Sequence, residues 1–211
     1  MTCKLAGLYA ITPDEARTDI LVRKVGEALR GGASALQYRN KTAGPELRRA
    51  QGRALAALCR AAGAIFIVND DLELALELDA GGVHLGAADG DLADARRRLG
   101  QAKLLGASCY NRIELAEAAA QAGADYLAFG SVFDSGTKPG AARAPLEIFA
   151  QARRSIKLPL VAIGGITLEN APPLFAAGAD AIAVISAVFD AVDIVASAAG
   201  FARLHQPQRM Q

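Results

Sequence analysis

The chain has 211 residues, enough for one sizeable hydrophobic core and too few for two ordinary domains joined by a linker. Its 23 basic and 22 acidic residues leave a formal net charge of +1, which excludes non-specific collection of nucleic acid or of an anionic membrane surface. No run of about 18 uncharged apolar residues occurs, so we expect no membrane-spanning segment.

Cysteine usage and the N-terminus predict a cytoplasmic protein. Cys3, Cys59 and Cys109 form an odd set without a C-x-x-C pair, which favours a reducing compartment over a disulfide framework or a zinc site. Lys4 is followed by no long apolar run, so no secretory signal is expected. The short basic run 96–98 is interpreted as a solvated helix face.

The fold is predicted from a phrase that recurs along the chain: a helical stretch, a turn of small residues and a short apolar run. Residues 122–129 and 177–184 are nearly identical copies of it, and looser copies lie at 31–37, 62–68 and 80–85. A glycine just past the last helical turn can adopt the left-handed cap conformation without a clash. The apolar run after it does not alternate cleanly, as expected for a strand whose outer face is covered by helices.

In chain order, the repeat predicts eight strands, near Leu8–Ile11, Leu36–Arg39, Ile65–Val68, Val83–Leu85, Leu104–Ser108, Tyr126–Phe129, Leu160–Ile163 and Ala181–Ile185. A helical pattern follows each strand, for example at Leu47–Ala61, Arg112–Gln121, Leu146–Arg154 and Leu168–Ala176. Eight such units of about 26 residues predict an α/β fold with a single (β/α)8 TIM barrel as one domain over residues 1–205. The polar tail 206–211 is expected to fray. A doubly wound open sheet is the alternative fold.

Active sites of such barrels lie at the C-terminal ends of the strands, so the polar residues after each apolar run are the candidates. After the second strand, Arg39 and Lys41 lie two residues apart and can reach one polyanion, Arg39 as a guanidinium fork and Lys41 as a point charge. Gln37 can both donate and accept, which suits the edge of a heterocycle. The alternative is an ordinary solvated loop.

Carboxylates follow the third and fourth strands. Asn69, Asp70 and Asp71 come after the third strand, and one of the two aspartates is expected to cap the next helix. Asp89 follows the fourth strand, where a helix cap is again the alternative role. Carboxylates beside the two cations indicate a hard cation such as Mg²⁺, which takes one or two carboxylates, water and phosphate oxygens.

Three residues of the fourth and fifth strands have different predicted roles. His84 lies within an apolar run and is expected to be structural, pointing into the barrel or the helix layer. Ser108 is a candidate ligand contact. Cys109 has no evident partner histidine, so it is not expected to be a nucleophile.

The segments that follow the sixth, seventh and eighth strands predict a phosphate site. The loop 130–140 holds three hydroxyls, three glycines and one lysine, which are groups that bind phosphate, although a flexible solvent loop is the alternative. Gly164 and Gly165 follow the seventh strand, and Ile185 and Ser186 follow the eighth; backbone amides at these exits match the phosphate site common to such barrels. The mouth is therefore predicted to hold two anion sites, one of them with a metal.

These segments together resemble the thiamine phosphate synthase family. The resemblance is carried, in order across nearly the whole chain, by Gln37–Lys41, Asn69–Asp71, His84–Gly86 with Asp89, Thr137–Lys138 and Gly164–Ile166. It implies a transferase that joins 4-amino-2-methyl-5-hydroxymethylpyrimidine diphosphate to 4-methyl-5-(2-phosphoethyl)thiazole, giving thiamine phosphate and diphosphate. The combination of segments is specific, whereas each segment alone is not.

The resemblance also implies roles for individual residues. Asp70 and Asp89 are expected to hold one Mg²⁺ per subunit. Contacts to the pyrimidine diphosphate are expected from Gln37, Tyr38, Arg39, Asn40, Lys41, Asn69, Ser108 and Lys138. Contacts to the thiazole phosphate are expected from Ser135, Gly136, Thr137, Gly165, Ile185 and Ser186. The residues expected to be catalytic are Arg39, Lys41, Lys138 and Ser108.

The site is rich in cations, and no activated nucleophile or general base is evident in the sequence. We therefore expect a Mg²⁺-assisted dissociative displacement, in which the neutralised diphosphate leaves and the thiazole nitrogen attacks. The expected partners are two small phosphorylated substrates, with neither nucleic acid nor membrane. The sequence leaves open whether the protein is a homo-oligomer.

Three positions depart from the family pattern. Ala87 stands where the family often has Gln, Ser135 replaces a frequent Thr, and Asp134 stands where Pro is frequent. Asp134 matters most, because a carboxylate near a phosphate is unfavourable unless it points away. One alternative function is that of a thiazole tautomerase, which typically has His where Ser131 stands. The other is a non-catalytic protein that binds thiamine precursors.

Overall fold

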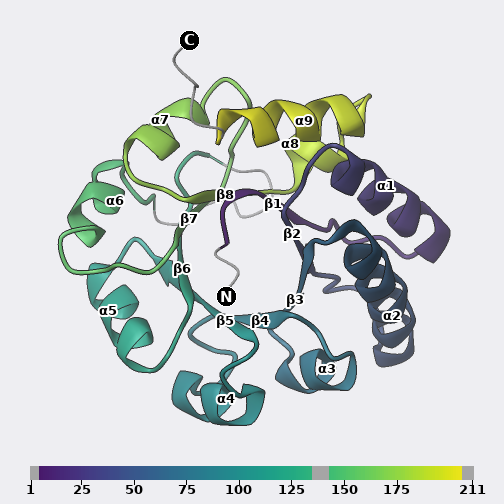
Figure 1. Cartoon of the computed structure of the whole chain (residues 1–211), viewed down its shortest axis with the longest axis horizontal. Coiled ribbons are helices and arrows are strands. Elements are labelled where there is room, and N and C mark those ends of the chain that lie inside the picture. Colours follow the sequence, from purple (N-terminus) through teal and green to yellow (C-terminus); the bar gives the residue numbers. More distant parts are fainter. Residues whose placement is uncertain (1–4, 135–142, 206–211) are drawn as a thin grey trace.

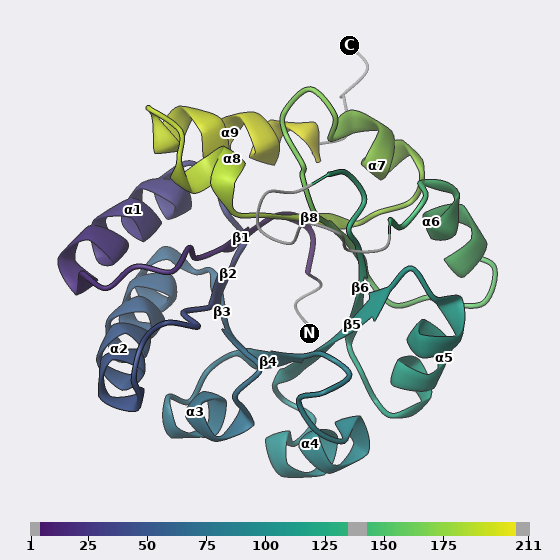
Figure 2. The same ribbon diagram turned by 180° about the vertical axis from the view of Figure 1, so that it is seen from behind.

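The computed structural model describes residues 5–134 and 143–205. Eight parallel strands form a closed barrel in sequence order, and the last strand pairs with the first. The strands are β1 Gly7–Ile11, β2 Ala35–Tyr38, β3 Ile65–Asn69, β4 Gly82–Leu85, β5 Leu104–Tyr110, β6 Tyr126–Gly130, β7 Leu160–Ile163 and β8 Ala181–Val184. The predicted TIM barrel is confirmed, and Figures 1 and 2 show the strand ring from its two sides.

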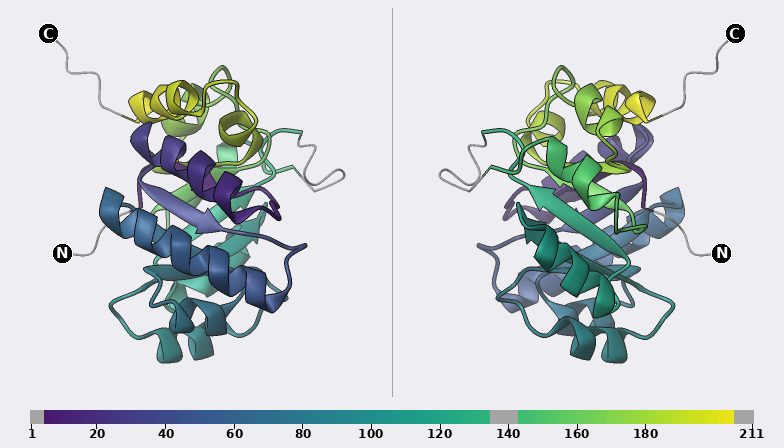
Figure 3. Two further views of the ribbon diagram at one scale, coloured as in Figure 1. Left: turned by 90° about the vertical axis from the view of Figure 1, so that its right-hand side faces the viewer. Right: turned by 90° about the vertical axis from the view of Figure 1, so that its left-hand side faces the viewer.

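Helices form the outer ring of the barrel. They are α1 Thr18–Arg30, α2 Pro45–Ala62, α3 Leu72–Glu77, α4 Leu92–Leu99, α5 Ile113–Gln121, α6 Glu147–Ala152, α7 Pro172–Ala176, α8 Ser186–Phe189 and α9 Ile194–Leu204. In α1 the buried residues Leu21, Val25 and Ala28 recur at helical spacing, so that one face packs inward. Figure 3 shows α1 and α2 side by side along the barrel wall. Within the described residues, no helix is long and apolar enough to cross a bilayer.

The strands separate two apolar cores because successive side chains point to opposite faces of the sheet. Outward-facing residues such as Leu36 and Phe66 pack under the helices in the larger core. Inward-facing residues, among them Ile67, Tyr126 and Val161, form a smaller core inside the barrel. The barrel interior is therefore packed, and its mouth at the strand C-termini is the place where polar side chains can gather.

The expected strand bounds agree with the structure to within one or two residues, but two of the expected helices are shorter: α6 spans Glu147–Ala152 and not Leu146–Arg154, and α7 lacks its expected first turn. Helix α7 begins at Pro172 and not at Leu168. The side chain of Asn170 accepts a hydrogen bond from Thr167 N at 2.7 Å and donates one to Gly165 O at 3.0 Å, which closes a turn before the helix. Proline is tolerated in the first helical turn, where its missing N–H has no partner to lose.

The predicted left-handed glycines are confirmed in part. Gly63, Gly123 and Gly178 follow helices with φ of 69°, 93° and 110°. In the copy at residues 80–85, however, the left-handed residue is Asp79, with φ of 48°. Aspartate adopts this conformation more readily than most residues with a side chain, so this turn does not need glycine.

Two matching arginine clusters lie at the N-terminal end of the barrel, against the turns that precede the strands. Arg96 pairs with Asp125 before β6, and its Nε donates to Gly123 O at 2.9 Å. Arg153 pairs with Asp180 before β8, and its Nε donates to Gly178 O at 3.2 Å. The two aspartates also accept from backbone amides at 2.7 Å, those of Leu105 and Leu160. The interpretation of Arg96 as a solvated residue is therefore wrong: it is 8% exposed and fixes the repeated turn.

Candidate active site at the barrel mouth

The two cations predicted after β2 lie together and share one acidic partner. Asp14, after β1, accepts from Arg39 Nη1 at 3.3 Å and from the backbone N of Lys41 at 2.7 Å. Thr12 and Arg39 exchange hydrogen bonds, Thr12 Oγ1 to Arg39 O at 2.7 Å and Arg39 N to Thr12 Oγ1 at 2.8 Å. The Arg39 side chain is 16% exposed and that of Lys41 is 55% exposed. The residues that follow β1 thus hold the residues that follow β2 in place, and Lys41 extends into solvent.

Two residues of the predicted pyrimidine site lie elsewhere. Tyr38 faces the helix layer, where its hydroxyl donates to Gln51 Oε1 of α2 at 2.9 Å. Asn40 is buried, and its Nδ2 donates to Glu15 O at 2.8 Å and to Gln51 Oε1 at 3.0 Å. Strand alternation turns Tyr38 to the face opposite Gln37. The structure therefore gives Tyr38 and Asn40 packing roles and does not bring them into the mouth.

Asp70 and Asp71 have separate roles. Asp71 caps α3 by accepting from Leu74 N at 2.9 Å, as expected for one of the pair. Asp70 has a left-handed backbone, with φ of 62°, and its amide donates to His84 O at 2.8 Å. Its carboxylate oxygen Oδ2 lies 3.3 Å from the ammonium nitrogen Nζ of Lys41. Asp70 therefore connects the C-terminal ends of β2, β3 and β4.

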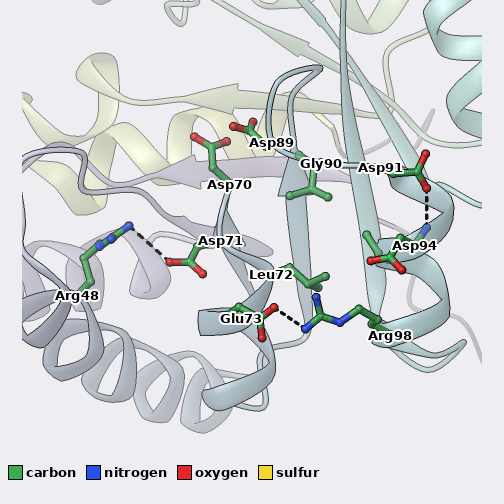
Figure 4. Close-up of a pocket in the computed structure, with 12 residues that line it drawn as sticks. Arg48, Asp70, Asp71, Leu72, Glu73, Asp89, Gly90, Asp91, Asp94 and Arg98 are labelled. Atoms are coloured by element: carbon green, nitrogen blue, oxygen red, sulfur yellow. Dashed lines mark hydrogen bonds and ion pairs between the residues drawn. The ribbon is translucent and has the colours of Figure 1, made fainter.

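Asp89 is not a helix cap, because Asp91 caps α4 by accepting from Asp94 N at 2.7 Å. Asp89 Oδ2 instead accepts from Gly86 N at 2.7 Å. Figure 4 shows the carboxylates of Asp70 and Asp89 next to each other at the rim, apart from the ion pairs of the neighbouring helices. Partial burial and the nearby Asp70 carboxylate raise the pKa of Asp89, and the bond from Gly86 opposes this rise.

The donor set at this rim fits Mg²⁺. Within the described residues, no group of three or more His, Cys, Asp or Glu side chains lies close enough together to enclose a metal. Asp70 and Asp89 form a pair of oxygen donors whose mutual repulsion a cation would relieve. Magnesium ordinarily takes one or two carboxylates and completes its shell with water and substrate phosphate oxygens. A carboxylate pair beside Lys41 is thus suited to a metal that arrives with a diphosphate.

A hollow of about 390 Å³ lies on the helix side of the same pair. Besides Asp70 and Asp89 it is lined mainly by α3, α4 and the residues before them, including Glu73 and Arg98, and by Arg48 of α2. Those side chains are engaged in ion pairs, Arg48 with Asp71 at 3.5 Å and Arg98 with Glu73 (Figure 4). The lining is predominantly acidic, so a phosphate is better placed on the Lys41 side of the pair than in this hollow.

A hydrogen-bonded chain forms the floor of the mouth inside the barrel. Gln37 Nε2 donates to Tyr9 Oη at 2.6 Å, and the hydroxyls of Tyr9 and Tyr126 lie 2.9 Å apart. His84 bonds to Tyr126 Oη through Nδ1 at 3.1 Å and to Ser108 Oγ through Nε2 at 2.9 Å. His84 thus points into the barrel, and Gln37 and Ser108 are joined through it.

Asn69 and Cys109 lie where strand alternation places them. Asn69 ends β3 on the inward-facing series that includes Ile67, so its side chain faces the mouth. Cys109 is fully buried among outward-facing residues of the larger core, and burial raises its pKa to about 12. The thiol therefore lies away from the mouth and is protonated, in agreement with the expectation that it is not a nucleophile.

Exits seven and eight place glycine backbone beside the start of α8. Gly164 and Gly165 have φ of 107° and 62°. A Cβ on Gly165 would lie 2.3 Å from Asp134 O, so only glycine fits beneath the loop after β6. Ile185 and Ser186 follow β8, which pairs with β7, and Ser186 is exposed. Ser135, Gly136, Thr137 and Lys138 lie outside the described residues.

Sequence reasoning missed Asp14, Tyr9 and Tyr126. Asp14 lies after β1 in Thr12-Pro13-Asp14-Glu15, a polar exit that could have been weighed like the others. Tyr9 and Tyr126 lie within apolar runs, where a tyrosine looks like ordinary core. Their hydroxyls meet across the barrel interior although they are 117 residues apart, so no local signal links them.

A closed barrel with cations, paired carboxylates and glycines at its strand exits defines a class, the TIM-barrel enzymes that act on small charged substrates. A family model described as thiamine monophosphate synthase matches residues 8–188. A thiamine-phosphate synthase of Aromatoleum aromaticum is 57% identical over 201 residues, covering 95% of this chain and 97% of that one. One of Methylobacillus flagellatus is 54% identical over 200 residues, covering 95% of each.

Among solved structures, a thiamine phosphate pyrophosphorylase from Pyrococcus furiosus is similar with a TM-score of 0.85 and 38% identity, covering 95% of each chain. The chain belongs to the thiamine monophosphate synthase family. It is accordingly an enzyme of the transferase type, and the resemblance stated from the sequence is confirmed.

Proposed function

We propose that the enzyme condenses 4-amino-2-methyl-5-hydroxymethylpyrimidine diphosphate with 4-methyl-5-(2-phosphoethyl)thiazole to form thiamine phosphate and diphosphate. The observation that carries the proposal is the contact of Lys41 with Asp70 beside Asp89, where three neighbouring strand exits meet. Such a group binds a diphosphate and its counter-cation at the same time. The names of the similar proteins support the same reaction.

Asp70 and Asp89 would hold one Mg²⁺, and Arg39 and Lys41 would contact the diphosphate. When bound, the metal supplies neutralising charge to the leaving diphosphate. Arg39 offers paired N–H donors to phosphate oxygens and is held in place by Asp14. Lys41 can exchange its contact with Asp70 for a phosphate oxygen, because more than half of its side chain is exposed. Lys138, outside the described residues, is proposed as a further cation.

The bond changes need no general base. The bond between the pyrimidine methylene carbon and the bridging oxygen breaks, and the electron pair leaves with the diphosphate. The thiazole nitrogen then donates its lone pair to the methylene carbon, so no proton has to be removed. The residues of the mouth would act by holding charge and position, which are the main sources of catalysis in such a displacement.

The second phosphate would bind at exits six to eight. Gly165, Ile185 and Ser186 are proposed contacts, together with Ser135, Gly136 and Thr137 outside the described residues. Asp134 is exposed, and its carbonyl, not its carboxylate, lies against Gly165. Ser131, at the position where the tautomerase has His, donates its hydroxyl to Phe133 O at 2.6 Å and offers no acid–base group. A cytoplasmic location is part of the proposal, supported by buried free Cys59 and Cys109.

The reaction is tested by mixing the two phosphorylated substrates with the enzyme and Mg²⁺ and looking for thiamine phosphate by mass spectrometry. Asp70→Ala should lower turnover by about 10³-fold, the order of loss for one charge-stabilising group, while thiazole phosphate still binds. Asp71→Ala is the matched control, because it removes the adjacent carboxylate, which caps α3 and pairs with Arg48 but does not contact Lys41. Absence of product while both substrates bind would overturn the proposal, and equal loss of both binding events in Asp70→Ala would overturn the division of the mouth.

The dissociative path has its own test. Fluorine on the pyrimidine side chain withdraws electrons and destabilises a cation at the methylene carbon. The rate of the chemical step, measured in single turnover, should fall steeply with fluorination. A rate that does not change would show direct displacement by the thiazole nitrogen.

A further inference from the structure

The hydrogen-bonded chain on the floor of the mouth has a direction. An amide nitrogen can only donate, so Tyr9 Oη accepts from Gln37 Nε2. The single Tyr9 proton is then available for Tyr126, and the single Tyr126 proton for His84 Nδ1. An accepting Nδ1 places the ring proton on Nε2, which donates to Ser108 Oγ. The Ser108 proton remains available to a ligand.

Burial keeps this direction intact. Desolvation raises the pKa of both Tyr9 and Tyr126 above the ordinary value, so each phenol keeps its proton. The ring of Tyr126 stacks on His84, with centroids 5.5 Å apart, and meets Tyr9 edge to face at 6.0 Å. A Cβ on Gly106 would lie 2.0 Å from Tyr126 Cζ, so the glycine of β5 provides the space that lets the phenol reach the histidine.

The chain runs down from one strand exit, across the barrel and up to another. Tyr9 pairs in register with Ala35, two residues before Gln37 on β2. Tyr126 likewise lies two residues before Ala128, the register partner of Ser108. Gln37 and Ser108 are therefore the ends nearest the mouth, and the two tyrosines lie one inward-facing layer deeper.

We propose that Tyr9, Tyr126 and His84 are positioning residues that couple Gln37 to Ser108, so that the mouth presents an amide oxygen acceptor at one end and a hydroxyl donor at the other. This inference rests on the proposed function, because it concerns the same pyrimidine. An aminopyrimidine edge offers an N–H donor beside a ring nitrogen acceptor, which matches this pair. A 4-oxo pyrimidine offers the reverse pattern, and accepting it would require Gln37, both tyrosines, the His84 tautomer and Ser108 to reverse together.

The direction of the chain can be measured without any substrate. The protein has two histidines, and His205 is exposed, so nitrogen-15 NMR of histidine-labelled full-length enzyme can distinguish the two rings. We expect His84 to be neutral with its proton on Nε2. A proton on Nδ1, or a doubly protonated ring, would overturn the proposed direction. This measurement stands whether or not the enzyme makes thiamine phosphate.

The coupling is tested by comparing kcat/KM for the 4-amino and 4-oxo pyrimidine diphosphates. The intrinsic reactivities of the two substrates cancel when their ratio is compared between variants. Tyr9→Phe and Tyr126→Phe should each narrow the preference for the amino compound by about tenfold, the value of one net hydrogen bond, because Gln37 is released from Ser108. Tyr38→Phe is the matched control: it removes another buried tyrosine hydroxyl, one that bonds to α2, and should change the ratio less than about twofold.

The outcomes separate the two proposals. A wild-type enzyme that makes no product would overturn the proposed function, while the histidine spectrum still reports the direction of the chain. An active enzyme in which Tyr9→Phe and Tyr38→Phe leave the ratio equally unchanged would overturn the coupling alone. An equal narrowing by Tyr38→Phe would also overturn it, since a general loosening of the barrel would then be the cause.

Discussion

At the N-terminal end of the barrel, the guanidinium groups of Arg96 and Arg153 bond to an aspartate and to backbone carbonyls. At the C-terminal end, Lys41 is largely exposed and Asp89 lies beside a second carboxylate. The same residue types thus satisfy one another at one end and remain available to a ligand at the other. The difference separates charges that hold the fold from charges that are proposed to bind the substrate.

The largest expected effect on folding stability is at the N-terminal end. Arg96→Met should lower the free energy of unfolding by about 3 kcal/mol, because Asp125 and several carbonyls lose their donor. The folded fraction should keep its kcat/KM. Urea unfolding followed by circular dichroism measures the change. Arg97→Met is the control, since this exposed arginine pairs with Asp94 within one helix and should cost about 0.5 kcal/mol or less. Similar losses in both variants would remove the distinction between the buried cluster and an ordinary surface pair.

An intermediate effect is expected where one exit supports another. Asp14→Ala removes the acceptor shared by Arg39 and Lys41 and should raise KM for the pyrimidine diphosphate about tenfold. Asp14→Asn keeps an acceptor oxygen and should raise KM less. Glu15→Ala is the control, because the Glu15 side chain accepts from Arg17 N, away from the cations. Steady-state kinetics measures this KM. A KM equal to wild type in Asp14→Ala would show that Arg39 and Lys41 do not need Asp14 to hold their positions.

The smallest effect should have the opposite sign. Asp89→Asn should stabilise the metal-free protein at pH 7 by a few tenths of a kcal/mol, because the raised pKa of Asp89 marks a folded state that disfavours the charge. Asparagine can still accept from Gly86 N. This gain in stability should disappear as the pH falls through the raised pKa of Asp89 toward the ordinary aspartate value of about 4. There the folded protein carries Asp89 in its protonated form, which is as neutral as asparagine. Thermal unfolding across this pH range measures it, and destabilisation at pH 7 would mean that Asp89 has a structural role.

The sequence predicted the barrel because its repeat is local: each small-residue turn and apolar run shows a helix end and a strand on its own. Asp70, Asp89, Arg39 and Lys41 could be placed because parallel strands in a barrel bring their exits together. The role of Arg96 could not be predicted, because its partners lie 27 and 29 residues ahead in the sequence. They come close to Arg96 only when the helices pack against the barrel.

The floor of the mouth was predicted only at its ends. Gln37 and Ser108 lie near the C-terminal ends of their strands, where a polar residue is conspicuous. Tyr9, Tyr126 and His84 were hidden inside apolar runs, and only the closed barrel shows that their polar atoms meet. The side chain of Tyr38 was misplaced for the opposite reason. Tyr38 is next to candidate site residues in the sequence, yet one step along a strand turns a side chain to the other face of the sheet.

Binding of inorganic diphosphate, followed by isothermal titration with and without Mg²⁺, tests the central claim most directly. Wild-type enzyme should bind diphosphate in a Mg²⁺-dependent manner, and Asp70→Asn should weaken that binding by about 100-fold, whereas Arg97→Met should leave it unchanged. Diphosphate binding that does not depend on Mg²⁺, or that survives in Asp70→Asn, would contradict the assignment of the open charges at the C-terminal end to a metal-bound diphosphate.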